Sequence, residues 1–213
     1  IMEVPLVLFT FLLIAGGYRY ARSGNLGWAV LAGAAAGLMY ATKETWVMSI
    51  AAMGVALVAT SLWQRHVEPR DSAADELRPR ALLRLFNWRV AVAVGVWAAV
   101  AIVFFSSFFT NWRGPVDAVL AYVHAASRAV GGKAEGGNLH THPWASYLRW
   151  LFWTDYPGRG PVWTELLIGV LALAGTVAGF TRRGLGKGDA RLVRFLSVYT
   201  IVLLAIYSVL PYK

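Results

Sequence analysis

Apolar runs long enough to cross a lipid bilayer recur along this chain, and they constrain its fold more than any other feature. They cover residues 4–22, 26–42, 45–63, 90–109, 161–181 and 193–211. Runs of about 16 to 22 residues suit the thickness of a hydrocarbon core. Because backbone polar groups in lipid must be satisfied within their own segment, each run is expected to be a helix. The sequence therefore predicts an all-α membrane protein with about six transmembrane helices.

The composition supports the same class. Of the 213 residues, 58% are hydrophobic and 15% are charged, whereas about a quarter of the residues in soluble proteins are charged. The first run lacks the basic stretch and the small-residue cleavage site of a signal peptide, so it is expected to remain in the mature protein. The absence of cysteine excludes disulfides, thiolate metal ligands and a cysteine nucleophile.

Basic residues are unevenly divided between the two sides that the connections would face. One side carries Arg19 and Arg22, six arginines between residues 65 and 89, and five basic residues between 182 and 194. Cytoplasmic loops are enriched in lysine and arginine, so these connections are expected to be cytoplasmic and the long segment 110–160 external. The net charge of +9 is then an orientation signal. A nucleic-acid site is not expected, because the arginines flank helix ends and do not cluster with exposed aromatic residues.

The external segment 110–160 is long enough to carry function. Residues 114–130 predict a helix with Pro115 in its first turn, and a second helix is expected to start at Pro143. Both helices are expected to lie at the membrane surface. The glycine-rich stretch GGKAEGGNLHTH between them can act as a substrate-ordering loop or as a plain connection, and its position favours function. Apolar residues of the first helix are Val116, Val119, Leu120 and Val123.

Helix packing and the membrane boundary have their own signals. Gly33 and Gly37, four residues apart, allow a neighbouring helix to approach closely. Six tryptophans stand near expected helix ends, where amphipathic rings prefer the headgroup zone, and they are interpreted as an aromatic belt. They are Trp28, Trp46, Trp63, Trp88, Trp112 and Trp163.

Six ionisable residues gather on the expected external side, at helix ends or in the long segment. An ionisable group in the bilayer core costs roughly 2.5–3.5 kcal/mol on insertion scales, so such groups should be paired, reach the headgroups or be functional. In the short tip YATKETW, position alone favours a solvated turn at the headgroup level, with a substrate-binding role as the alternative. The six residues are Glu3, Lys43, Glu44, His140, His142 and Lys213.

The two histidines admit more than one interpretation. His140 and His142 are two residues apart, but a histidine pair without a neighbouring carboxylate or thiolate cluster is weak support for a metal site. Loop structure or contact with substrate is favoured. No metal ligand set is assigned from the sequence, and whether a divalent metal is used stays open.

Five stretches, in order, carry a family resemblance: IMEVPL, GLMYATKETWV, FFTNWRGP, HTHPWASYL and LPYK. Together they resemble the multi-pass GT-C glycosyltransferases, which take sugars from polyprenyl-phosphate carriers. The nearest branch is the family 39 protein-mannosyltransferase-like proteins, including flippase-activity-associated proteins of archaeal and bacterial glycosylation. The resemblance spans nearly the whole chain but only the middle of a typical member. Residues 1–213 are therefore interpreted as a partial GT-C-like transmembrane domain, expected to be inactive alone.

The resemblance implies particular roles. Family members carry their catalytic acid, usually an Asp followed by another acidic residue, in the first external loop after the first transmembrane helix; no such pair stands in an expected external loop of this chain, so that acid is expected upstream of residue 1. Glu3 matches a later acidic position and is the catalytic candidate. Lys213 is the candidate for binding the donor's phosphate, and Lys43 is a second one. Glu44, His140 and His142 are the remaining substrate-binding candidates.

Two classes of function follow, with a purely structural membrane subunit as a third. The first is a hexosyl or pentosyl transferase in the cell membrane, with a polyprenyl-phosphate sugar donor and membrane lipids as partners. The alternative is a transporter or lipid-flippase-associated component without catalysis. No apolar run has an ionisable residue near its centre, which counts against a pathway through the bilayer midplane. The sugar, the acceptor and the oligomeric state are not assigned.

Overall fold

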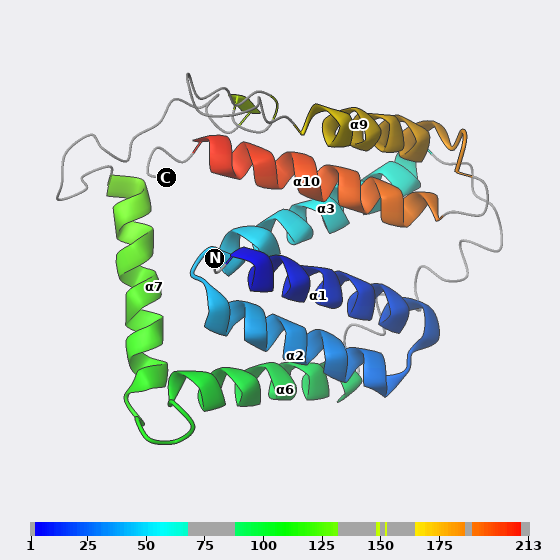
Figure 1. Ribbon diagram of the computed structural model, residues 1–213. Coiled ribbons are helices and arrows are strands. Elements are labelled where there is room, and N and C mark those ends of the chain that lie inside the picture. Colours follow the sequence, from blue (N-terminus) through cyan, green and yellow to red (C-terminus); the bar gives the residue numbers. More distant parts are fainter. Residues whose placement is uncertain are drawn as a thin grey trace. The chain divides into compact units, whose positions relative to one another are not determined.

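The structure is a computed structural model that describes residues 3–67, 88–131, 148–149, 152, 165–185 and 189–209. Seven helices form its regular elements (Figure 1). They are α1 (Glu3–Ser23), α2 (Leu26–Thr42), α3 (Trp46–His66), α6 (Trp88–Phe105), α7 (Gly114–Gly131), α9 (Leu166–Thr181) and α10 (Ala190–Val209).

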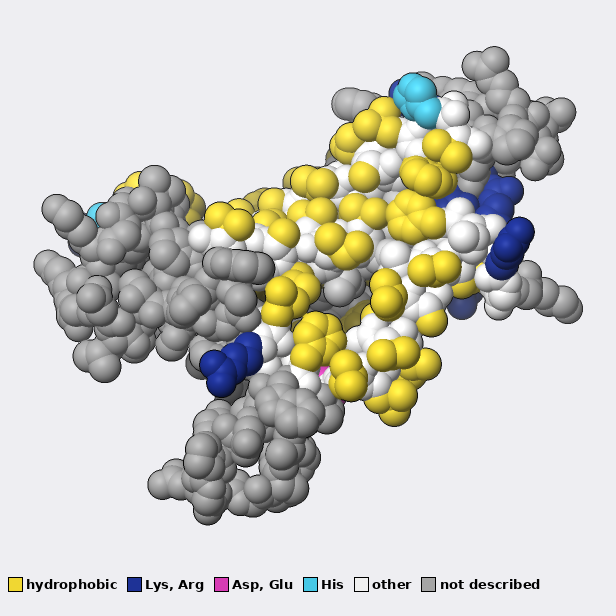
Figure 2. All heavy atoms as spheres, turned by 90° about the horizontal axis from the view of Figure 1, so that it is seen from above, with side chains coloured by type: hydrophobic (Ala, Val, Ile, Leu, Met, Phe, Trp, Pro, Cys, Tyr) yellow, Lys and Arg dark blue, Asp and Glu magenta, His cyan; other side chains and the backbone are white. Residues whose placement is uncertain are grey.

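The helix surfaces are those of a membrane protein. Helices α1, α3, α6 and α10 are long and apolar enough to cross a bilayer, and α2 and α9 are shorter apolar helices. Only 6% of the apolar window of α6 and 11% of that of α10 is fully buried within the protein, and the other residues of these helices are half-buried or exposed. Hydrophobic side chains cover much of the described surface (Figure 2). The predicted class, an all-α membrane protein, is confirmed.

The chain divides into two compact units. The first comprises residues 1–49 and 68–125, and the second comprises residues 50–67 and 126–213. Helices α1, α2 and α6 belong to the first unit with most of α7. Helices α9 and α10 belong to the second unit with most of α3.

Helix α2 is the centre of the first unit, and small residues let its neighbours come close. A Cβ atom on Gly33 would overlap the backbone carbonyl of Ala93 in α6. One on Gly37 would lie 2.8 Å from Cβ of Val100 and 3.0 Å from the carbonyl oxygen of Trp97. The close helix approach predicted at these glycines is confirmed, and α6 is the partner.

Charges are segregated between the two ends of the first unit. The α1–α2 pair is antiparallel, since the Thr10 hydroxyl contacts Met39 Sδ at 3.9 Å, whereas α2 and α6 run parallel. One end therefore carries arginines, and Arg89 there donates a hydrogen bond to the Gly24 carbonyl. The acidic residues described in this unit, Glu3, Glu44 and Asp117, belong to helix ends and a connection at the other end.

A tight corner separates α6 from α7. Helix α6 ends at Phe105, four residues before the predicted boundary at 109, because Ser107, Phe108 and Phe109 adopt left-handed conformations with φ of 49°, 57° and 69°. The buried Ser106 hydroxyl accepts a hydrogen bond from the Phe109 amide at 3.0 Å. Helix α7 then runs crosswise to α6 (Figure 1).

In the second unit, α9 and α10 pack against each other. Arg194 of α10 is 1% exposed, and its Nε donates a hydrogen bond to the Gly179 carbonyl at 2.7 Å. The Thr176 and Ser197 hydroxyls also bond across the pair at 3.1 Å. A buried guanidinium is tolerated here because it satisfies a carbonyl in the last turn of α9, where cations are favourable.

Candidate functional site

The connection between α2 and α3 is the structural centre of the candidate site. Only residues 43–45 lie outside the two helices. The Lys43 amide donates to the Met39 carbonyl at 3.4 Å, and the Trp46 amide donates to the Lys43 carbonyl at 3.1 Å. Lys43 is half-buried while Glu44 is exposed. The two neighbouring side chains therefore project into different surroundings, as expected for adjacent positions.

An aromatic cluster from four helices surrounds this tip, with the Tyr40 ring at its centre. The ring centroid of Tyr40 lies 4.7 Å from that of Phe105, 5.1 Å from those of Trp46 and Tyr122, and 5.8 Å from that of Trp97. Such pairs contribute about 0.5–1.5 kcal/mol each beyond the area they bury. The tip is thus held by packing from α2, α3, α6 and α7.

Tyr122 links α7 to the end of α2. Its hydroxyl donates a hydrogen bond to the Tyr40 carbonyl at 3.0 Å, which satisfies one of the free carbonyls of the last turn of α2. The pKa of Tyr122 is raised to about 12, mainly by burial and then by the neighbouring Tyr40, with a lowering by Trp46 and a small further rise from Glu44. At neutral pH the phenol is protonated, so it acts as a hydrogen-bond donor and not as a base.

Two polar atoms beside the tip are buried without a hydrogen bond. They are Thr45 Oγ1 and Trp46 Nε1. The indole N–H of Trp46 lies close enough to the Tyr122 hydroxyl to lower its pKa as a hydrogen-bond donor, but the contact does not meet hydrogen-bond geometry. An unmet buried polar group costs about 1–3 kcal/mol.

Helix α7 presents two faces. Its helical character is as predicted, and it turns Tyr122 and the buried Ala118 toward the rest of the first unit. The predicted apolar positions point outward: Val116, Val119, Leu120 and Val123 are all more than half exposed. An outward apolar face on a helix that runs crosswise to α6 suits a location at the membrane surface.

The predicted site residues are only partly within the described part of the chain. Glu3 is the first residue of α1, and the antiparallel α1–α2 packing brings the start of α1 to the same end of the first unit as Lys43 and Glu44. His140, His142 and Lys213 lie outside the described residues. Among the residues that are described, no three His, Cys, Asp or Glu side chains are grouped to hold a metal ion.

The aromatic residues of the cluster were not identified as site residues from the sequence. Trp46 was assigned to the aromatic belt, yet its ring packs against Tyr40 and its N–H is buried. Tyr40 and Tyr122 are 82 residues apart in sequence, so no local pattern connects them. The available signal was the pair of aromatic residues, Tyr40 and Trp46, that flank the charged tip.

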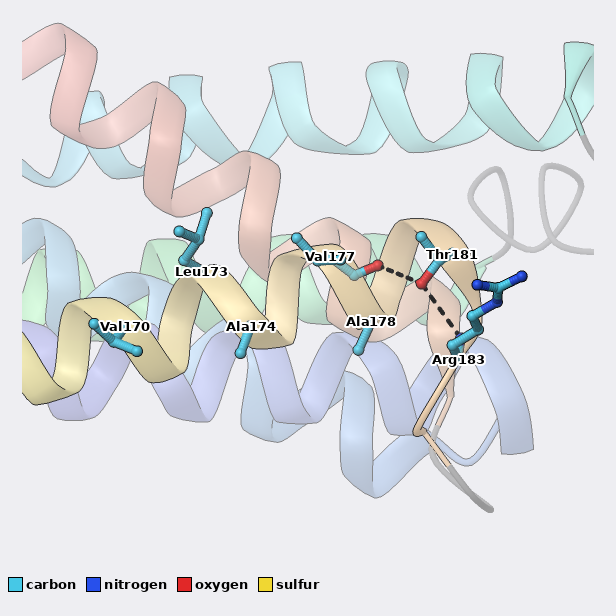
Figure 3. Close-up of a pocket in the computed structure, with 7 residues that line it drawn as sticks. All are labelled: Val170, Leu173, Ala174, Val177, Ala178, Thr181 and Arg183. Carbon is cyan, nitrogen blue, oxygen red and sulfur yellow. Dashed lines mark hydrogen bonds between the residues drawn. The ribbon is translucent and has the colours of Figure 1, made fainter.

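A hollow of about 570 Å³ lies along α9 in the second unit, apart from the residues of the candidate site (Figure 3). Its lining is mainly apolar, and Arg183 is its one charged side chain. The Thr181 hydroxyl there bonds the Val177 carbonyl of the same helix at 2.7 Å. Without a carboxylate or a histidine in its lining, this hollow has no group for acid–base chemistry.

Comparison with known proteins finds one family match, over the N-terminal third of the chain. Residues 2–70 match the family described as dolichyl-phosphate-mannose-protein mannosyltransferase. The matched part contains α1, α2, the charged tip and α3. The resemblance to GT-C mannosyltransferase-like membrane proteins is thereby confirmed. Neither the curated proteins nor the solved structures contain a match to the chain.

Proposed function

We propose that this chain, a relative of the GT-C mannosyltransferases over residues 2–70, forms part of an enzyme that transfers a sugar from a polyprenyl-phosphate donor to an acceptor on the external face of the membrane. The observation that carries the proposal is the tip itself. The matched segment contains the end of α2, the half-buried Lys43 and Trp46, whose ring packs in the aromatic cluster around Tyr40.

The proposed reaction needs a base and a cation. A carboxylate removes the proton from the acceptor hydroxyl, the oxygen forms a bond to the anomeric carbon, and the bond from that carbon to the lipid phosphate breaks. We assign the carboxylate role within this chain to Glu3. A cation stabilises the negative charge that develops on the departing phosphate, and Lys213 and Lys43 are assigned to it.

The remaining assignments concern substrate binding. Glu44 is proposed to accept hydrogen bonds from sugar hydroxyls, and His140 and His142 are proposed to hydrogen-bond the sugar or the phosphate, since an imidazole can donate as well as accept. Thr45 and Trp46 join them, since their buried polar atoms have no partner in the described part of the chain. The packing of Tyr40 and Tyr122 would keep these groups in place while substrate exchanges.

Substitutions in the intact membrane protein test the assignment. Transfer of radiolabelled mannose from polyprenyl-phosphate-mannose to membrane acceptors is measured after reconstitution. Glu3→Gln is expected to reduce transfer by about 100-fold or more, as loss of a general base does. Lys43→Ala and Lys213→Ala are each expected to reduce it about tenfold, the loss of one charge-assisted contact.

Glu165→Gln is the matched control, because Glu165 is exposed and belongs to the second unit. Its transfer rate should equal that of the unsubstituted protein. Unchanged transfer in Glu3→Gln, with normal protein level, would remove Glu3 from the site. If the unsubstituted protein moves the labelled lipid across vesicle membranes and transfers no mannose, the flippase-associated alternative is correct.

A further inference from the structure

A recess marks the end of the first unit opposite to the charged tip. It has a volume of about 410 Å³ and lies where α1 turns into α2. It is lined by Tyr18, Arg19, Arg22, Ser23 and Trp28. All five residues come from two helices that pack together over a small-residue contact, since a Cβ on Gly16 would lie 3.2 Å from the Trp28 carbonyl oxygen.

Both arginines of the recess are placed by aromatic rings. The guanidinium carbon of Arg19 lies 5.4 Å from the ring centroid of Trp28. That of Arg22 lies 5.7 Å from the ring centroid of Tyr18, whose hydroxyl accepts a hydrogen bond from Arg22 Nη1 at 2.9 Å. A ring at this distance attracts and helps to position a guanidinium, and the five N–H donors of an arginine can serve more than one partner.

The turn that frames the recess is satisfied without using the Arg19 side chain. The Arg19 carbonyl accepts from the Ser23 hydroxyl at 2.8 Å, and the Gly24 carbonyl accepts from Arg89. Asn25 caps α2 through the Gly27 amide at 2.8 Å. Among the described residues, the Arg19 guanidinium has no hydrogen bond or ion pair, only its contact with Trp28.

No acidic residue described in the first unit belongs to this end, because Glu3, Glu44 and Asp117 are at the other. Two arginines line the recess and Arg89 bonds the Gly24 carbonyl of the same turn, so the described residues give this end positive charge. The C-terminus of α1 and the N-terminus of α2 meet there, so their helix dipoles offset each other. An anion is therefore the ligand that the recess would attract.

From this arrangement we propose that the recess binds the headgroup phosphate of an anionic phospholipid. The two guanidinium groups donate to phosphate oxygens, the form of recognition for which arginine is best suited. The rings of Tyr18 and Trp28 lie at the headgroup level beside the acyl chains. Because the recess ends two apolar membrane helices, a lipid reaches it from within the leaflet. Expected orientation makes that leaflet the cytoplasmic one.

The test counts lipids on the intact protein. Purified protein is titrated with phosphatidylglycerol or phosphatidylcholine in detergent, and bound lipids are counted by native mass spectrometry. At least one phosphatidylglycerol should bind more tightly than phosphatidylcholine. Arg19→Gln with Arg22→Gln should weaken that binding about tenfold or more, since hydrogen bonds to charged groups contribute about 1.5–3 kcal/mol. The matched control is Arg182→Gln with Arg183→Gln, two exposed arginines on the second unit, and it should bind like the unsubstituted protein.

Two further arms make the result decisive. Arg19→Lys with Arg22→Lys keeps both charges but loses the two planar guanidinium groups beside the rings, so it should bind phosphatidylglycerol more weakly than the unsubstituted protein does. If the double lysine variant binds phosphatidylglycerol as tightly as the unsubstituted protein, the proposed geometry is overturned. It is also overturned if Arg19→Gln with Arg22→Gln and Arg182→Gln with Arg183→Gln weaken binding equally, because the effect would then come from the protein's overall charge. Displacement of lipid by inorganic phosphate, beyond that by chloride at equal ionic strength, would identify a free-phosphate site and overturn the lipid assignment. Because sugar transfer is not measured, the outcome is separate from that of the proposed function.

Discussion

The Tyr40 ring is predicted to hold the charged tip in place, and replacing it with alanine tests this directly. Tyr40→Ala removes four ring contacts with centroid separations of 4.7 to 5.8 Å. Four such pairs sum to about 2–6 kcal/mol, and aromatic-to-alanine changes in cores cost about 3–5 kcal/mol. Because Tyr40 is half-buried, we expect a loss near 3 kcal/mol in the free energy of unfolding.

The assay is reversible unfolding by SDS in mixed micelles, followed by far-ultraviolet circular dichroism. Tyr40→Phe keeps the ring and all four contacts, so it should change the free energy of unfolding by less than about 1 kcal/mol. Trp112→Ala is the second control, because Trp112 is 71% exposed and stacks with Phe109 alone among the described rings. Equal losses in Tyr40→Ala and Trp112→Ala would refute the reasoning, since the cluster would then contribute no more than an exposed ring.

Three further perturbations test other contacts. Arg194→Met should lower the free energy of unfolding by about 1.5–3 kcal/mol, since it breaks a buried charge-assisted hydrogen bond. Arg183→Met, at an exposed position, should not lower it. Equal losses in the two variants would contradict a stabilising role for the bond between Arg194 and the Gly179 carbonyl. Gly33→Ala should destabilise by about 1–3 kcal/mol because its Cβ would overlap Ala93, and Gly17→Ala, where a Cβ meets nothing within 4 Å, serves as its control. Tyr122 has a pKa raised to about 12 by burial, so its contribution to stability is complete below its unfolded pKa of about 10 and is lost as pH rises toward 12. Between about pH 10 and 12 the melting temperature of Tyr122→Phe should therefore fall less than that of the unsubstituted protein. If the melting temperatures of the two proteins fall in parallel with pH, the raised pKa of Tyr122 is contradicted.

Helix positions could be predicted because lipid imposes a simple rule on the backbone. A long apolar run in a bilayer must be helical, and the runs at 4–22 and 26–42 contain α1 and α2 almost residue for residue. The end of α6 was predicted too late, since Phe108 and Phe109 are as apolar as the helix before them. Hydropathy carries no signal for the left-handed backbone that ends it.

The candidate site was predictable only in part. Lys43 and Glu44 stand out because charges beside apolar runs are rare, and the Gly33–Gly37 spacing indicates a close helix contact. The partner helix at that contact could not be predicted, since it comes from residues some sixty positions later. The cluster around Tyr40 was missed for the same reason: its members belong to four helices, and their proximity arises only in the packed protein.

The parallel packing of α2 and α6 has a consequence for how the protein is made. During synthesis α1 and α2 can pair as soon as they leave the ribosome, because they are sequential and antiparallel. Helix α6 emerges only after α3, so Gly33 and Gly37 face lipid alone until it arrives. The Gly24 carbonyl likewise waits for Arg89. Nascent chains that end before residue 88 would therefore carry an unfilled seam along α2, a surface for membrane chaperones or quality-control proteases to recognise.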